Sequence, residues 1–119
     1  MLYQYTPKGQ SEGIFDDYTG MGEATEPECG DVLCIYIRTR REIITEIGYT
    51  ISNGACTTSK VCAAVVCNLA LNKPVMEAYL VDADQIAGEI GDIPQAGKHC
   101  AMMAELSLKR AIVNYAKNR

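Results

Sequence analysis

The sequence predicts an α+β fold, in which helices pack on one face of a small antiparallel sheet of about three strands. Two segments rich in β-branched and aromatic residues come first, at residues 32–39 and 43–51. Three segments in which apolar residues recur at helical spacing follow them, between residues 57 and 116. This grouping of strands before helices is typical of α+β domains.

The length of 119 residues predicts a single domain over residues 1–119 with one core. Residues 1–19 are rich in Gly, Ser, Thr and acidic residues and carry few apolar ones, so we expect them to form a flexible arm. A short strand is predicted around residues 20–24.

The two segments that open the predicted sheet are expected to form a hairpin. Residues 32–39 alternate with apolar side chains on both faces, which predicts a strand buried on both sides. Residues 43–51 are expected to be its antiparallel partner. Residues 52–54, Ser-Asn-Gly, then form a turn.

Helix signals follow this turn. Residues 57–71 predict a helix that ends before Pro74, because proline cannot continue it. Asp82 or Asp84 is expected to cap a short helix. Residues 98–116 predict an amphipathic helix whose apolar stripe consists of Ala104, Leu108, Ala111, Ile112 and Tyr115.

Composition excludes several classes of partner. Fifteen acidic and eleven basic residues give a net charge of −4, which disfavours nucleic acid as a partner. No apolar stretch approaches the roughly 20 residues that cross a bilayer, and the first residues lack the pattern of a signal peptide. We therefore expect a cytoplasmic protein with no membrane contact.

Six cysteines are too few for a disulfide scaffold of this length, so free thiols or metal ligands are favoured. No pair has the C-x-x-C spacing of a zinc knuckle, so any site must be assembled from distant segments. Cys34, Cys62 and Cys67 fall inside periodic elements and are interpreted as structural thiols. Of these, Cys67 lies opposite the apolar stripe of its helix and could be partly exposed.

The other three cysteines, Cys29, Cys56 and Cys100, are expected at a turn and at two helix starts, where the local field favours a thiolate. Asp31 and His99 stand beside them as candidate fourth ligands. Three thiolates with one nitrogen or oxygen donor fit a tetrahedral zinc site or a labile iron–sulfur cluster. By spacing alone, a metal or cluster site and three incidental thiols are equally favoured.

The cysteine motifs together resemble those of a known family, the iron–sulfur cluster scaffolds of the IscU and NifU N-terminal type. The residues that carry the resemblance are the glycine-rich residues 20–24, Pro27-Glu28-Cys29-Gly30-Asp31, residues 49–56, Asn72-Lys73-Pro74, Ile93-Pro94, His99-Cys100 and Ala104-Glu105. The three cysteine motifs occur in the family's order and at similar separations.

The resemblance implies a scaffold and carrier rather than an enzyme. Such a protein receives sulfur from a cysteine desulfurase and iron from an iron donor, holds a transient [2Fe–2S] cluster, and passes it to recipient apo-iron–sulfur proteins. Cys29, Cys56 and Cys100 would be the ligands, Asp31 the weak fourth ligand and His99 its alternative. Lys98 could neutralise cluster charge, although a solvated lysine is the simpler interpretation.

Zn²⁺ could occupy the same site, since it also binds thiolate and imidazole ligands. The protein is expected to be a monomer or a weak homo-oligomer. Two other functions remain open at this point. One is a persulfide-accepting protein of the sulfurtransferase type with a three-cysteine zinc site. The other is an interaction domain stabilised by zinc.

Overall fold

The computed structural model describes residues 10–12, 18–27, 30–52, 54–91 and 97–118. Its elements are β1 (Gln10–Glu12), β2 (Gly20–Thr25), β3 (Val32–Arg40), β4 (Ile43–Ile51), α1 (Thr57–Ala70), α2 (Val75–Ala78), α3 (Ala83–Ile90) and α4 (Gly97–Asn118). None of the helices in these ranges combines the length and the apolar character that crossing a bilayer requires.

Within the described residues the sheet has the strand order β1-β4-β3-β2. Strands β2, β3 and β4 are antiparallel, as the sequence predicts. Arg41 and Glu42 connect β3 to β4, and both have positive φ, as two-residue hairpin turns of type I′ require. The fourth strand, β1, pairs in parallel with β4 and was not predicted, because it lies within residues assigned to the arm.

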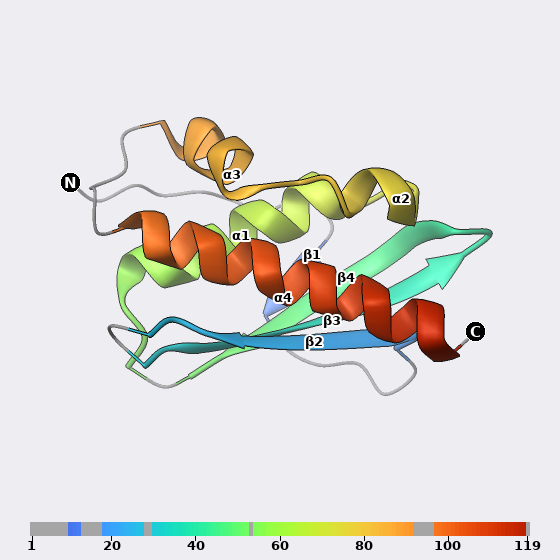
Figure 1. Ribbon diagram of the computed structural model, residues 1–119, viewed down its shortest axis with the longest axis horizontal. Coiled ribbons are helices and arrows are strands. Elements are labelled where there is room, and N and C mark those ends of the chain that lie inside the picture. The colour runs from blue at the N-terminus through green and yellow to red at the C-terminus, as the bar shows by residue number, and fades with distance from the viewer. Residues whose placement is uncertain (1–9, 13–17, 28–29, 53, 92–96, 119) are drawn as a thin grey trace.

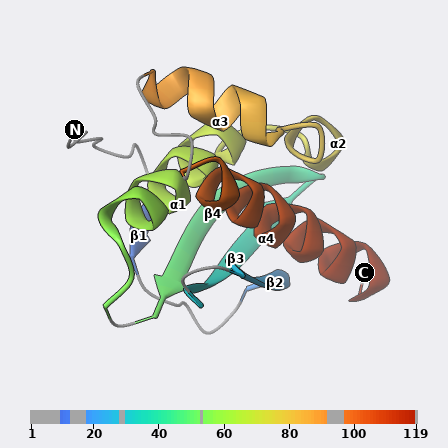
Figure 2. The same cartoon turned by 60° about the vertical axis from the view of Figure 1, so that its left-hand side comes forward.

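All four helices lie on one side of the sheet (Figures 1 and 2). This confirms the predicted α+β arrangement. Alternate residues of β3 point into the layer between sheet and helices and are fully buried there: Leu33, Ile35 and Ile37. The opposite face of β3 is buried as well, at Cys34 and Tyr36, where the ring of Tyr18 lies 5.2 Å from that of Tyr36.

Strand β2 and helix α4 approach each other so closely that only glycine fits between them. A Cβ atom on Gly22 would lie 2.2 Å from the backbone nitrogen of Ala111 and 2.3 Å from the carbonyl oxygen of Ser107. The Ser107 hydroxyl, which is fully buried, donates a 2.8 Å hydrogen bond to the Gly22 carbonyl. These contacts fix α4 across the sheet and thereby place its first turn near the start of β3.

The helix ends follow the predicted signals with small shifts. Asp82 is the N-cap of α3 and forms a capping box with Gln85, which selects it over Asp84. The single-turn helix α2 after Pro74 was not predicted. Cys67 is fully buried, so the expectation that it could be partly exposed was wrong. The reason is that α1 packs against α4, α3 and the sheet, so more than one face of this helix is covered.

Candidate functional site

Three segments that are far apart in the sequence meet at one end of the molecule. The first is Asp31, the residue before β3. The second is Cys56, the N-cap of α1, and the third is the first turn of α4, which carries Cys100. In Figure 1 this end lies on the left, where α1 and α4 begin. Three of the predicted site residues are therefore brought together.

The carboxylate of Asp31 is buried and held by two donors from the start of α1. Its Oδ2 atom accepts a 2.8 Å hydrogen bond from the Ser59 hydroxyl and a 3.3 Å hydrogen bond from the backbone nitrogen of Cys56. Only 7% of the residue is exposed. The carboxylate therefore has a defined position beside Cys56.

The two sulfur atoms lie next to each other, with the Ser59 hydroxyl between them. Cys56 Sγ is 4.0 Å from Cys100 Sγ. The Cys56 side chain is the N-cap of α1 and accepts a hydrogen bond from the backbone nitrogen of Ser59 at 3.4 Å. Ser59 Oγ lies 3.3 Å from Cys56 Sγ and 3.2 Å from Cys100 Sγ. Cys56 is half-buried, whereas Cys100 is buried.

Burial raises the pKa of the Cys100 thiol to about 11, and the neighbouring Cys56 and Glu26 add to this effect, while the hydrogen bond from Ser59 opposes it. The expectation that a helix start lowers the pKa of this thiol was therefore wrong. Cys100 is shielded from water, and the loss of hydration outweighs the field of the helix. In the metal-free protein Cys100 is a neutral thiol at neutral pH.

Glu26 is a buried acidic residue near this site that sequence reasoning missed. It follows β2 and is 1% exposed. Its backbone nitrogen donates to the carbonyl of Asp31, and its carbonyl accepts from the nitrogen of Gly30, both at 2.8 Å. These bonds fix the two ends of the segment that contains Cys29. Cys29 itself lies outside the described residues.

Ser59 was missed for a similar reason, since a serine in the first turn of a helix has no distinctive sequence pattern. Its side chain is nevertheless fully buried and contacts Asp31, Cys56 and Cys100. Both Ser59 and Glu26 become recognisable as site residues only once the fold brings the three segments together.

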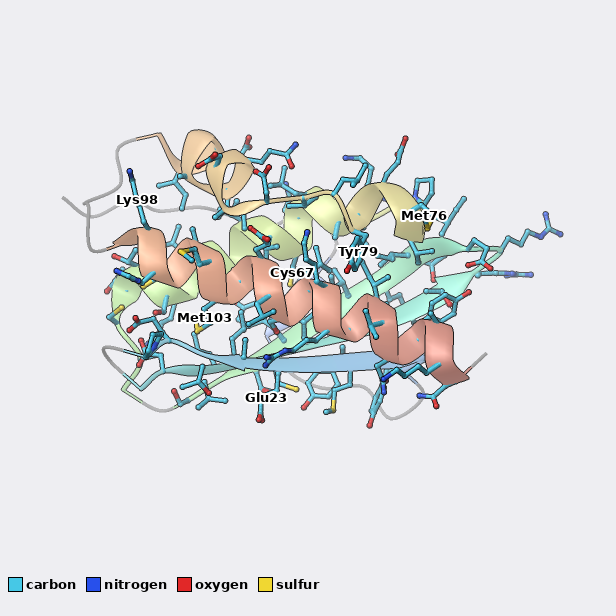
Figure 3. The ribbon with its side chains drawn as sticks, viewed as in Figure 1. Glu23, Cys67, Met76, Tyr79, Lys98 and Met103 are labelled. Carbon is cyan, nitrogen blue, oxygen red and sulfur yellow. The ribbon has the colours of Figure 1, made fainter. Side chains whose placement is uncertain are left out.

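Lys98 and His99 are exposed at the start of α4. Figure 3 shows Lys98 directed away from the sheet, whereas Met103 on the same helix is directed toward it. His99 lines a surface hollow of about 410 Å³ together with Thr25, Pro27, Met102, Met103, Glu105 and Leu106. His99 is therefore exposed at the surface of the protein, whereas Asp31 is buried.

Within the described ranges, no three His, Cys, Asp or Glu side chains form a group that could hold a metal ion. The arrangement of Asp31, Cys56 and Cys100 is a partial donor set of one carboxylate and two sulfurs. The third predicted thiol, Cys29, lies in the segment whose fixed ends are Glu26 and Asp31. The donor types match soft metals that prefer sulfur.

The remaining described cysteines are buried free thiols, which confirms the predicted burial of Cys34 and Cys62. Burial raises the pKa of Cys62 to about 12, and the neighbouring Cys100 and Cys56 contribute. The pKa of Cys67 is also raised by burial. Neutral, buried thiols of this kind act as small apolar side chains in the core.

Comparison with known proteins gives consistent matches along nearly the whole chain. The profile of the family described as NifU-like N terminal domain matches residues 3–119. The iron-sulfur cluster assembly scaffold protein IscU 1 of Archaeoglobus fulgidus is 27% identical over 114 residues, which cover 96% of this chain and 73% of that protein. The corresponding IscU of Escherichia coli (strain K12) is 30% identical over 104 residues, covering 87% and 80%.

Solved structures show the same fold. A NifU-like protein (N-terminal) from Brucella abortus superimposes with a TM-score of 0.68 at 12% identity, covering 91% of this chain and 86% of that one. A protein from Fervidobacterium islandicum, described as an iron-sulfur cluster assembly scaffold for the SUF system, has a TM-score of 0.66 at 16% identity, covering 88% and 87%.

Proposed function

Because the chain belongs to the family of NifU-like N-terminal domains, we propose that it is a scaffold on which iron–sulfur clusters are assembled. Relatives that are 27% and 30% identical to it over the aligned residues carry this function in their names. The role is that of a carrier, which binds and releases its cargo rather than converting a substrate. The cluster is therefore cargo, and the site must both hold it and release it.

The observation that carries this proposal is the 4.0 Å contact between Cys56 Sγ and Cys100 Sγ, beside the buried carboxylate of Asp31. Two sulfurs at this distance can ligate one iron or two adjacent irons. We propose that Cys29 is the third thiolate ligand. The cargo we propose is a [2Fe–2S] cluster, and Zn²⁺ can compete for the same thiolates.

Asp31 is the fourth ligand that the geometry supports best, since its carboxylate contacts the backbone of Cys56 directly. An oxygen donor is harder than thiolate and binds iron of a cluster less strongly, which makes that position exchangeable. The exposed His99 is the alternative fourth ligand, and the exposed cation Lys98 offsets negative charge on the cargo. Weak ligation at one position favours transfer.

Binding of iron displaces the protons of the cysteine ligands, since only thiolates ligate metal. For Cys100 this requires the loss of a proton from a thiol whose pKa is about 11 in the metal-free protein. Nearby metal charge supplies that free energy. We propose that a cysteine desulfurase supplies the sulfur, that an iron donor supplies the iron, and that recipient apo-iron–sulfur proteins accept the finished cluster.

The test is anaerobic reconstitution with iron, cysteine and a cysteine desulfurase, followed by visible absorption and Mössbauer spectroscopy. The wild type should form a cluster and transfer it to an apo-ferredoxin, whereas Cys29→Ser, Cys56→Ser and Cys100→Ser should each lose or weaken it. Cys34→Ala is the matched control, because Cys34 is a buried thiol in β3 whose neighbours are Tyr36 and Glu23 rather than the site residues. Full cluster retention in any of the three serine variants would contradict the ligand assignment.

One observation favours a second function, that of a persulfide acceptor. Cys56 is half-buried while Cys100 is buried, so a sulfur donor reaches one thiol of the pair more easily than the other. In that case desulfurase treatment without iron should add one sulfur atom to Cys56 by mass spectrometry. Sulfur transfer should then depend on that cysteine alone, and no cluster should form.

A further inference from the structure

Ser59 stands at the centre of the site although its side chain belongs to none of the expected ligand types. It lies in the first turn of α1 and is fully buried. Its hydroxyl oxygen is 2.8 Å from Asp31 Oδ2, 3.2 Å from Cys100 Sγ and 3.3 Å from Cys56 Sγ. One hydroxyl therefore contacts a carboxylate and two sulfurs at the same time.

The hydroxyl has a single proton, so it cannot donate to Asp31 and Cys100 together. A carboxylate oxygen is a stronger hydrogen-bond acceptor than the sulfur of a thiol, which accepts only weakly. The proton of Ser59 then lies toward Asp31, at the shorter of the two distances. The Cys56 thiol can donate to the Ser59 oxygen in return.

Metal binding reverses this preference. A ligating Cys100 becomes a thiolate, which is a charged acceptor, while a metal ion that takes Asp31 as ligand competes for the lone pairs of the carboxylate. Ser59 Oγ is already 3.2 Å from Cys100 Sγ, so a rotation of the hydroxyl is enough to turn its proton toward that sulfur. The backbone nitrogen of Ser59 donates separately to Cys56 Sγ, so this bond does not compete for the hydroxyl proton.

We propose that Ser59 is a positioning residue that strengthens the hold of the site on its cargo by donating a hydrogen bond to the metal-bound sulfur of Cys100. This inference rests on the proposed scaffold function and deepens it. A hydrogen bond to a ligating sulfur stabilises its negative charge, which favours the ligating thiolate and raises the reduction potential of a cluster. The same hydroxyl holds Asp31 in place until the metal arrives.

Co²⁺ is the probe for this proposal, because its charge-transfer bands with thiolate sulfur report on the electron density of that sulfur. In Ser59→Ala the bands should move to lower energy than in the wild type, since the ligating sulfur regains electron density. Loss of Co²⁺ to a chelator should become faster by roughly threefold or more, as expected when one hydrogen bond to the bound thiolate is removed. Ser59→Thr retains the hydroxyl and should restore the wild-type band position.

The matched control is Ser107→Ala. Ser107 is also a fully buried helical serine, but its hydroxyl donates to the carbonyls of Gly22 and Leu33, away from the thiols. The charge-transfer bands of the Ser107→Ala variant with Co²⁺ should match those of the wild type. Equal bands in Ser59→Ala and the wild type, or an equal shift in Ser107→Ala, would overturn the role of Ser59 while leaving the scaffold function intact. Absence of sulfur-to-cobalt bands in the wild type would overturn both.

Discussion

At the residue scale, the buried thiols decide how the protein responds to alkali. Cys67 is fully buried, and burial raises its pKa above the value of 9.0 that the unfolded chain retains. Above pH 9 the unfolded state therefore loses the proton of this thiol while the folded state keeps it. The free energy of unfolding should fall as pH rises, by about 1.4 kcal/mol per buried thiol between pH 8 and pH 10.

Urea unfolding of the metal-free, reduced protein at several pH values measures this fall. Cys67→Ala removes one titrating thiol, so its free energy of unfolding should decline less steeply than that of the wild type. The variant should be somewhat less stable at pH 7, since a small cavity replaces the sulfur. An identical slope in the two proteins would show that Cys67 ionises equally in both states.

The roles of the site residues can be predicted from the sequence to different degrees. The positions of Cys56 and Cys100 at helix starts follow from turn and capping signals. Their proximity to Asp31 is expected only from the family resemblance, because local signals do not bring distant segments together. The pKa of Cys100 does not follow from local signals either, because it depends on how much protein covers the first turn of α4. Ser59 gains its contacts only from tertiary packing, which no local pattern encodes.

At the element scale, the contact between β2 and α4 sets the position of the long helix. Replacement of Gly22 by alanine would force a Cβ atom to within 2.2 Å of the Ala111 nitrogen, and both partners are backbone. The strand and the helix must then separate. Gly22→Ala should lower the free energy of unfolding by about 2–4 kcal/mol, in the range of severe overpacking.

Gly88→Ala is the matched control for this prediction. Gly88 lies within α3, and nothing lies within 4 Å of the position of its added Cβ. Alanine should therefore stabilise the helix by about 0.5–1 kcal/mol. Thermal or urea unfolding of both variants gives the comparison. If the two substitutions changed stability equally, close packing of β2 on α4 would not explain the effect.

The elements that sequence analysis missed are short or depend on distant partners. Strand β1 has three residues, too few for an alternating pattern, and it exists through pairing with β4. Helix α2 is a single turn with Pro74 as its N-cap, although the sequence predicts this proline only as the end of the preceding helix. The longer elements each carry at least one buried stripe or cap, and their predicted bounds agree with the structure within two residues.

At the scale of the whole molecule, the site lies at one end of elements that the core also joins, since α4 packs against both α1 and β3. Asp31, Cys56 and Cys100 come from three parts of the chain and meet at one end of the layered fold. The core lies between the sheet and the helices and is built from apolar residues along their full length. The fold therefore stands on its own core, and a metal at the site adds a cross-link between three segments.

Zinc binding tests how far the stability of the fold depends on the site. Binding to the folded state alone stabilises it by about 4 kcal/mol when free zinc is about 1,000 times its dissociation constant, which corresponds to a rise in Tm of roughly 10–20 °C. Cys100→Ser should lose most of this rise, while Cys34→Ala should keep it. Calorimetry with zinc and with a chelator measures both effects.

The chelated protein decides between a scaffold and a domain that zinc stabilises. Cys100 belongs to the core and Cys56 packs against it, but most core residues come from the sheet and helices away from the site, so the metal-free chain should still unfold cooperatively, with a lower Tm than the zinc form. A scaffold needs this property, since it must stay folded after its cargo has left. Loss of cooperative unfolding on chelation would instead show that the metal holds the fold together, and the interaction-domain alternative would then account for the three cysteines.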